Sequence, residues 1–329
     1  MPTFCRHNRF LANCPICSAD QVDVVSSRRT STTKPAAGAA RGASSTRSSR
    51  SGGAVRVRQI TREQEDGFRS QLVPGVKASA AAERLAEEVA FACARLGLLA
   101  GDSPDLYGEV ARLEDREEAL WLAFLIAYLG PLDGDDPFVA VRAAHTSWAS
   151  GELPQLDDAA LGPRTAHDPA RGSATLVAYR AWAERAGSQD VAFAGEPAWS
   201  PDRRFARAFE RLALPGLHRD ARYDLLVTLG ELGLHAMRAG TLQLGGPDET
   251  TVAAKRVFGI ADTLLLERRA SEFAAAGEVP LAALDLALWN WNRPPRPGPS
   301  GERGGTALGA VGVEPDADAY ARVAAALGL

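Results

Sequence analysis

Four side chains near the start of the chain have the types and spacing of a metal site. Three cysteines and one histidine fall within thirteen residues, namely Cys5, His7, Cys14 and Cys17. Cys5 and His7 can reach one ion together, since residues i and i+2 of an extended chain point the same way. Three cysteines with one histidine form a closed structural zinc set. We therefore predict a structural zinc site, and leave open a redox-active CxxC pair or free thiols in a disordered tail.

A second candidate lies in an apolar helix predicted from Pro280. The string PLAALDLALWNWN (280–292) carries a single charge, Asp285. At 100° per residue, one face carries Leu281, Leu284, Leu288 and Trp291. Asp285 and Asn292 lie at the edge of that face, and Trp289 lies one turn beyond Asp285. A buried carboxylate must be paired, neutralised or directed into a pocket, because leaving it charged and alone is costly.

Two interpretations of Asp285 follow. The functional one makes it a catalytic carboxylate, with Trp289 as a stacking surface and Asn292 beside it. The structural one is an ion pair with Arg222, Arg268 or Arg269. If Asp285 is fully buried against an arginine with no pocket beside it, the enzyme interpretation fails. A cleft lined by Trp289, with the 203–222 region at its rim, would support it.

Basic residues suggest a polyanion as partner. A predicted helix after Ser200 carries a stripe of arginines, and the next helix continues it, giving the set Arg203, Arg204, Arg207, Arg211, Arg219 and Arg222. Such a stripe can follow a phosphate backbone. The alternative is a solvated face balanced by neighbouring carboxylates. We keep both.

Two predicted helices joined by a tight turn at 258–261 precede the Asp285 helix. Backbone N–H groups at a helix N-terminus can bind a phosphate. Gly259 and Ile260 in the turn, with Lys255 before it, are therefore candidate nucleic-acid-binding residues.

Composition indicates a soluble globular body with a basic arm. The chain is 46% hydrophobic and 24% charged. Residues 1–62 carry eleven basic and two acidic residues, a net of +9, whereas the rest carries 26 basic and 39 acidic residues, a net of −13. The longest apolar run, 120–129, is about half of a membrane span, and the N-terminus lacks a signal-peptide pattern. We expect a cytoplasmic protein with no membrane contact.

The body should be all-α, since no stretch alternates with period two. We expect a zinc-knuckle-like segment at 1–20, a disordered basic linker at 21–75, a helical domain at 76–293, and a Pro/Gly linker with a short helix at 294–329. Within the domain, we expect helices at 79–96 (ended by Gly97), 117–129, 136–148, 173–186 and 219–230.

Three strings resemble one family. RDARYDLLVTLGELGL (219–234), TVAAKRVFGIADTLLLERR (251–269) and PLAALDLALWNW (280–291) are similar to the α-glutamyl/putrescinyl thymine pyrophosphorylase-like proteins, clade 3. That family resembles the helix-hairpin-helix DNA glycosylase superfamily. The resemblance implies a glycosylase-like fold over 76–293, action on modified thymine in DNA, Asp285 as general base or electrostatic stabiliser, and backbone binding by the Gly259 turn.

The chain departs from the glycosylase pattern at two positions. Ala261 stands where a second hairpin glycine is usual, and Thr263 stands where lyase-type glycosylases carry a nucleophilic lysine. A Schiff-base lyase is therefore not expected. A base-modifying enzyme also needs aromatic walls around a flipped base, and Trp289 and Tyr223 are candidates.

We therefore expect a DNA-binding enzyme that modifies a thymine-type base by displacing pyrophosphate, or excises it. The alternative is a non-catalytic helical nucleic-acid-binding or scaffold protein with a structural zinc site.

Overall fold

The structure is a computed structural model that describes residues 64–132, 136–171, 173–293 and 313–329. These residues belong to one compact unit, Gln59–Leu329. Every regular element in the described residues is helical, and no strand occurs among them. The expected all-α class is confirmed for this part of the chain.

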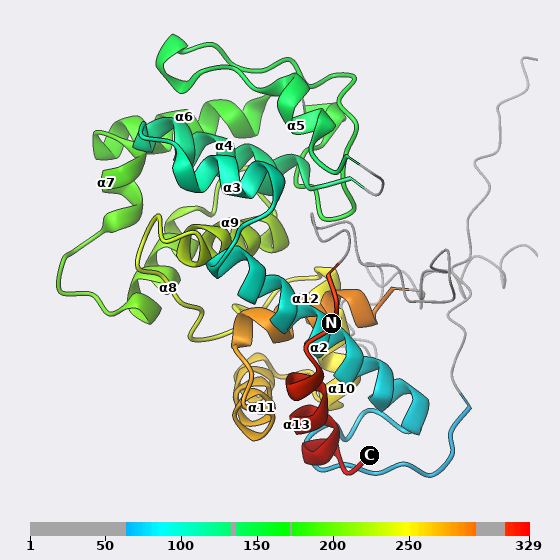
Figure 1. Ribbon diagram of the computed structural model, residues 1–329. Helices are drawn as coiled ribbons and strands as arrows, with labels where there is room; N and C mark the ends of the chain where they lie inside the picture. Colours follow the sequence, from blue (N-terminus) through cyan, green and yellow to red (C-terminus); the bar gives the residue numbers. More distant parts are fainter. Residues whose placement is uncertain (1–63, 133–135, 172, 294–312) are drawn as a thin grey trace, which may run out of the picture. The chain divides into compact units, whose positions relative to one another are not determined.

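The unit contains twelve described α-helices and two short 3₁₀ turns. In chain order they are α2 (Ser79–Ala100), α3 (Asp105–Arg112), α4 (Arg116–Leu129), α5 (Val139–Ala144), η2 (Trp148–Ser150), η3 (Pro169–Arg171), α6 (Ala174–Ala186), α7 (Gln189–Ala194), α8 (Pro201–Arg211), α9 (Arg219–Glu231), α10 (Glu249–Phe258), α11 (Thr263–Ala276), α12 (Leu281–Trp291) and α13 (Ala317–Leu327). In Figure 1, α3 to α7 are grouped in one half of this unit, and α2 and α10 to α13 in the other.

Helix α4 lies at the centre of the first group. Asp115 caps it by accepting hydrogen bonds from the N–H groups of Glu117 and Glu118. Its run ALWLAFLIAYL (119–129) has no polar face, and every residue in that run is buried. Helix α9 packs along α4. A helix that is apolar all round must be enclosed on all sides, which is what the sequence indicated.

Helix α12 holds the second group together. It packs against α2, α10 and α11, and residues 283–291 are all buried. The Trp291 indole N–H donates to the Ala81 carbonyl of α2 at 2.9 Å. Helix α13 also packs against α2, with its Val323 and Leu327 buried. Val73 also belongs to this core and is fully buried, although it precedes the expected start of the helical domain at 76.

The sequence placed most helices well and some ends wrongly. Gly97 does not end α2, which continues to Ala100, because a glycine inside a helix lowers the helix propensity by only about 1 kcal/mol. Helix α5 covers six residues instead of the expected stretch to 148. Helix α7 was not expected. The helix predicted after Ser200 is confirmed as α8, which Ser200 caps by accepting from the Arg203 N–H and which starts at Pro201.

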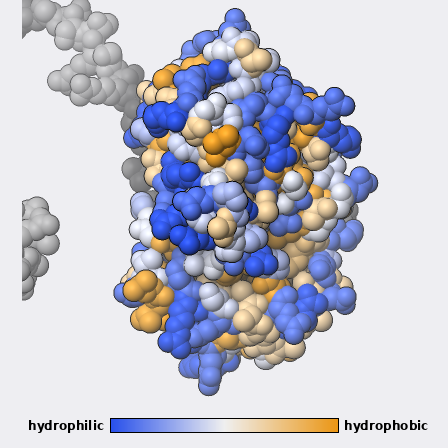
Figure 2. All heavy atoms as spheres, turned by 90° about the vertical axis from the view of Figure 1, so that its left-hand side faces the viewer, coloured by the Kyte–Doolittle hydropathy of each residue, from blue (hydrophilic) through white to orange (hydrophobic). Residues whose placement is uncertain are grey.

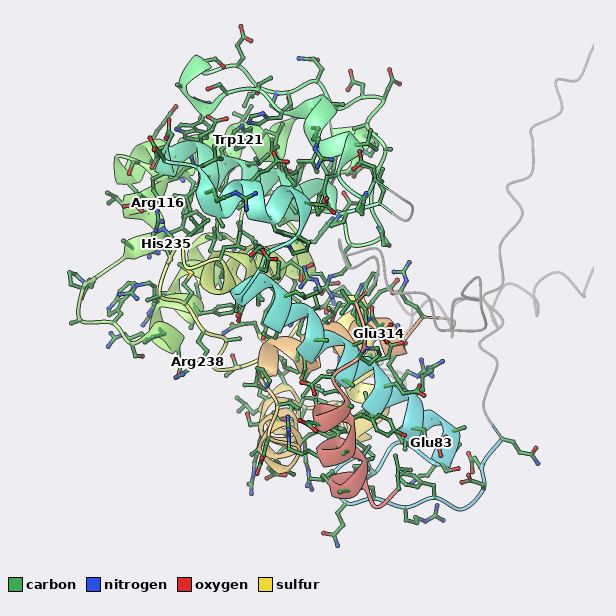
Figure 3. The ribbon with its side chains drawn as sticks, viewed as in Figure 1. Glu83, Arg116, Trp121, His235, Arg238 and Glu314 are labelled. Atoms are coloured by element: carbon green, nitrogen blue, oxygen red, sulfur yellow. The ribbon has the colours of Figure 1, made fainter. Side chains whose placement is uncertain are left out.

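A polar cluster joins α4 to the start of α7 and the loop after α9. The Glu117 carboxylate accepts hydrogen bonds from the backbone N–H groups of Gln189 and Asp190, both at 2.9 Å. Asp190 pairs with Arg116 at 3.1 Å and lies 3.4 Å from His235. Arg116 and His235 are neighbours in Figure 3. Burial lowers the pKa of His235 to about 4, so the imidazole is neutral at pH 7. This cluster ties α4, the start of α7 and the loop after α9 together.

One face of the described surface is mixed in character. Figure 2 shows polar and apolar side chains interspersed over the face that it presents. None of the described helices is both long and apolar enough to cross a membrane. The described residues also contain no group of three or more histidine, cysteine or acidic side chains suited to a metal. The predicted zinc ligands Cys5, His7, Cys14 and Cys17 lie outside the described residues.

Candidate functional site

Asp285 is the centre of a buried charged cluster. Its side chain is 1% exposed, although it sits on a helix made almost entirely of apolar residues. Arg164 and Arg219 face it from two other segments. Arg164 belongs to the irregular segment between η2 and η3, and Arg219 is the first residue of α9. Three parts of the chain distant in sequence therefore supply the cluster.

Both carboxylate oxygens of Asp285 are paired. Arg164 Nη2 lies 3.1 Å from Oδ2, and Arg219 Nη2 lies 2.5 Å from Oδ1. The guanidinium groups are themselves buried, with side chains 1% and 7% exposed. An ion pair of the kind expected as the structural interpretation is therefore present. The partners differ from those expected, since Arg268 and Arg269 pair with Glu272 and Arg222 donates to the Phe209 carbonyl.

Two further carboxylates, both from α9, complete the cluster around Asp285. Asp224 Oδ2 lies 2.8 Å from Arg164 Nε, and Asp220 Oδ1 lies 2.9 Å from Arg219 Nη1. The Thr250 hydroxyl donates to Asp220 at 3.1 Å. Asp220 and Asp224 are one helical turn apart, so both reach the same side of α9. Three carboxylates thus enclose two guanidinium groups.

The two carboxylates that share Arg164 and Arg219 titrate differently. Burial raises the pKa of Asp285 to about 6, because the two arginines offset only part of the loss of hydration. For Asp220, whose side chain is 14% exposed, the same arginines outweigh burial and lower the pKa. The arginines stay charged, since the surrounding carboxylates outweigh the effect of burial and raise their pKa. Asp285 is therefore ionised at neutral pH and takes up a proton in mildly acidic solution.

The pH dependence of unfolding should distinguish the wild type from Asp285→Asn. The folded-state pKa of about 6 lies above the ordinary value of 3.8, so the folded state binds this proton more tightly. The stabilising contribution is complete below about pH 4 and is lost as the pH rises through about 6. We expect the free energy of unfolding of the wild type, minus that of the variant, to fall over this range and then level off. Urea titrations at several pH values measure this difference in the free energy of unfolding. If the wild type and the variant depend on pH in the same way, the raised pKa of Asp285 is wrong.

Trp289 lies beside the cluster and is covered by cations. The Arg164 guanidinium carbon is 5.1 Å from the Trp289 ring centroid, and that of Arg293 is 4.2 Å away. Trp289 is 1% exposed and Tyr223 is fully buried, with its hydroxyl donating to the Thr241 carbonyl. Both aromatic side chains are therefore enclosed by protein in this conformation, and neither presents a face to solvent.

Asn292 has a different neighbourhood. Its amide oxygen accepts a hydrogen bond from Arg256 Nη1 of α10 at 2.6 Å, and the Arg256 guanidinium carbon lies 5.0 Å from the Trp291 ring centroid. Asn292 follows Asp285 by about two helical turns. Of the two residues predicted to act with Asp285, Trp289 lies beside the charged cluster, whereas Asn292 contacts Arg256 of α10.

Helices α10 and α11 are joined by a short turn, as expected. Gly259 takes a left-handed conformation with φ of +66°, and its N–H donates to the Lys255 carbonyl. Asp262 caps α11 by accepting from the Leu265 N–H at 3.0 Å. Lys255 is exposed and Ile260 is half-buried. The Asp262 carboxylate already occupies the helix N-terminus, which makes this end less favourable for a phosphate. Phosphate binding by the turn stays a prediction.

The predicted arginine stripe separates into two kinds of residue. Arg204 is anchored to the fold, since its guanidinium donates to the carbonyls of Ala194, Trp199 and Ala236. Arg219 belongs to the buried cluster, and Arg222 is half-buried with its guanidinium carbon 4.2 Å from the Phe209 ring centroid. The exposed members all lie on α8, and they are Arg203, Arg207 and Arg211.

Comparisons with family models, curated proteins and solved structures find no match to this chain.

Proposed function

We propose that this protein binds DNA through Arg203, Arg207 and Arg211 of α8, which we call the α8 arginine face. The observation that carries the proposal is the lack of compensating charge. Within the described residues, neither Arg203 nor Arg211 has a carboxylate within ion-pair distance. Arg207 pairs with Glu210 at 2.8 Å, but both side chains are more than half exposed, so water screens that pair.

The spacing of these arginines supports a linear polyanion as the partner. They follow one another at intervals of four residues, which places them on one side of α8 about 6 Å apart along its axis. A row of cations suits the repeated charges of a phosphate backbone, whose binding releases counterions and therefore weakens with salt. The excess of basic residues in 1–62 adds to the same attraction.

Binding of the full chain to a fluorescein-labelled DNA duplex, measured by anisotropy over a range of salt concentrations, tests this proposal. Three phosphate contacts alone should make the logarithm of the binding constant fall with the logarithm of salt, with a slope of about −2.7 or steeper. No binding at low salt would contradict both the catalytic and the non-catalytic DNA-binding hypotheses.

A second candidate function is modification or excision of a thymine-type base at Asp285, as the family resemblance implies. One observation favours it. A carboxyl whose pKa is about 6, buried among charges, has properties common in general acids and bases. The closed arrangement of Asp285 and its two arginines favours the non-catalytic alternative. By the catalytic proposal, the Arg164 segment and α12 must therefore separate to admit a flipped base.

An assay of Asp285→Asn on DNA containing modified thymines distinguishes these two. If Asp285 is catalytic, the variant should lose about a hundredfold or more in rate while binding DNA as tightly as the wild type. If the cluster is structural, the wild type shows no turnover, and the substitution changes stability only. Measuring DNA binding on the same samples shows whether a loss of activity results from a loss of DNA binding.

A further inference from the structure

Trp199 lies next to both unpaired arginines of the α8 arginine face. The Arg203 guanidinium carbon is 5.7 Å from the Trp199 ring centroid, and that of Arg211 is 5.5 Å away. Trp199 lies just before the Ser200 cap, and Arg211 follows it by twelve residues, or about three helical turns, so the ring and the Arg211 side chain must extend toward each other along α8. A half-buried tryptophan is thus shared by two exposed cations.

The backbone around Trp199 is built to hold the ring in place. Gly195 has a φ of +63°, and a Cβ there would lie 2.4 Å from a carbon of the indole. Only glycine therefore allows this close approach of chain and ring. On the other side, Arg204 donates to the Trp199 carbonyl and to two further carbonyls. The close approach of Gly195 and the hydrogen bond to the Trp199 carbonyl both restrict the position of the ring.

The energetics of this arrangement favour an anionic ligand. Two guanidinium groups that converge on one ring repel each other, and no described carboxylate lies within ion-pair distance of either. Cation–π attraction to the ring, about 0.5–1 kcal/mol at an exposed site, offsets part of the repulsion between the two guanidinium groups. The same contact already restricts the two arginine side chains, so they lose less rotamer freedom when they bind an anion. Arg211 Nε donates to the Arg207 carbonyl at 3.4 Å, whereas the terminal N–H groups of both arginines make no hydrogen bond to described residues and can donate to phosphate oxygens.

We infer that Trp199 is a positioning residue that holds Arg203 and Arg211 ready for the phosphates of a DNA backbone. This inference rests on the proposed DNA binding and deepens it. The indole is covered by glycine backbone and by the two arginines, so it acts through them and does not stack on a base. Trp199 should therefore raise affinity for any DNA sequence and contribute nothing to sequence preference.

Trp199→Leu in the full chain tests the inference, with Trp199→Phe as the matched control. We expect the leucine variant to bind a labelled duplex about tenfold more weakly at 50 mM salt, and its salt slope to be shallower by about one unit, as for the loss of one phosphate contact. Phenylalanine keeps an aromatic face for the cations and should restore most of the affinity. Both variants should keep the thermal midpoint of the wild type.

Several outcomes would overturn the inference. Wild-type affinity and slope in Trp199→Leu would show that the ring does not position the arginines. Equal losses in both variants, together with a lowered midpoint, would show a structural role only. Equal binding of the wild type to a polyglutamate peptide would show that the site takes carboxylates. Charge reversal of Arg203, Arg207 and Arg211 separates this inference from the proposed function, because wild-type binding by that variant would overturn DNA binding at α8 itself.

Discussion

Replacing Asp285 by alanine is expected to lower the free energy of unfolding by about 3–5 kcal/mol. The substitution leaves two guanidinium groups, of Arg164 and Arg219, buried without the carboxylate that lies between them. Asp224 and Asp220 still pair with the two arginines, so the loss should not exceed this range. Urea unfolding of the full chain near pH 7.5 measures the change.

Glu210→Ala provides the control for this measurement. It removes an ion pair of similar length, with Arg207 at 2.8 Å, from an exposed position. Its cost should be about 0–1 kcal/mol, because water solvates both partners once the pair is broken. If the loss in Asp285→Ala is no larger than in the control, the buried cluster does not contribute to stability, and the structural interpretation of Asp285 is wrong.

Reversing the charge of all three arginines of the α8 arginine face is expected to weaken DNA binding on the order of a thousandfold at 50 mM salt. Each phosphate contact contributes about a factor of ten at that concentration through counterion release. Arg203, Arg207 and Arg211 are exposed, so glutamate at each should leave the fold intact. Anisotropy with the labelled duplex gives the affinities, and the thermal midpoint checks folding.

Arg185→Glu is the matched control for the reversal. Arg185 is also an exposed arginine, in the last turn of α6. Reversing it lowers the net charge of the protein without touching α8, and it should change the affinity only slightly. If the two variants lose the same affinity for each charge reversed, the attraction is a property of the whole protein and not of α8.

The helices could be predicted because the signals that define them are local. Ser200-Pro201 starts α8, and the run 119–129 marks a helix enclosed on all sides. Gly97 misled the prediction for a physical reason. A glycine ends a helix only where the chain needs a left-handed residue or water must reach the backbone, and inside α2 it merely lowers the helix propensity by about 1 kcal/mol.

The cluster around Asp285 was only half predictable. A lone aspartate in an apolar helix must be paired or face a pocket, and this much follows from the sequence. Its partners could not be found in the same way, because Arg164 is 121 residues away and lies in an irregular segment. Arg222 was a reasonable expectation, but the register of α9 turns Arg219 inward in its place. A possible signal was the pair Asp220 and Asp224, which flanks buried positions of a helix that also begins with an arginine.

The arginine stripe shows the same limit. Charge and spacing indicate a polyanion-binding face, but they cannot tell a solvated guanidinium from one that anchors a loop. Arg203 and Arg204 are neighbours in sequence, yet one is exposed and the other donates to three carbonyls. Trp199 was missed altogether, because its contact with Arg211 depends on the path of the loop through Gly195.

The salt dependence of DNA binding, compared between the wild type and the triple charge reversal of α8, tests the proposed function most directly. The slope of log affinity against log salt counts the phosphate contacts that are lost, independently of small changes in overall affinity. We predict a slope shallower by about two to three units in the variant. Equal slopes for the two proteins would contradict the proposal that DNA binds through Arg203, Arg207 and Arg211.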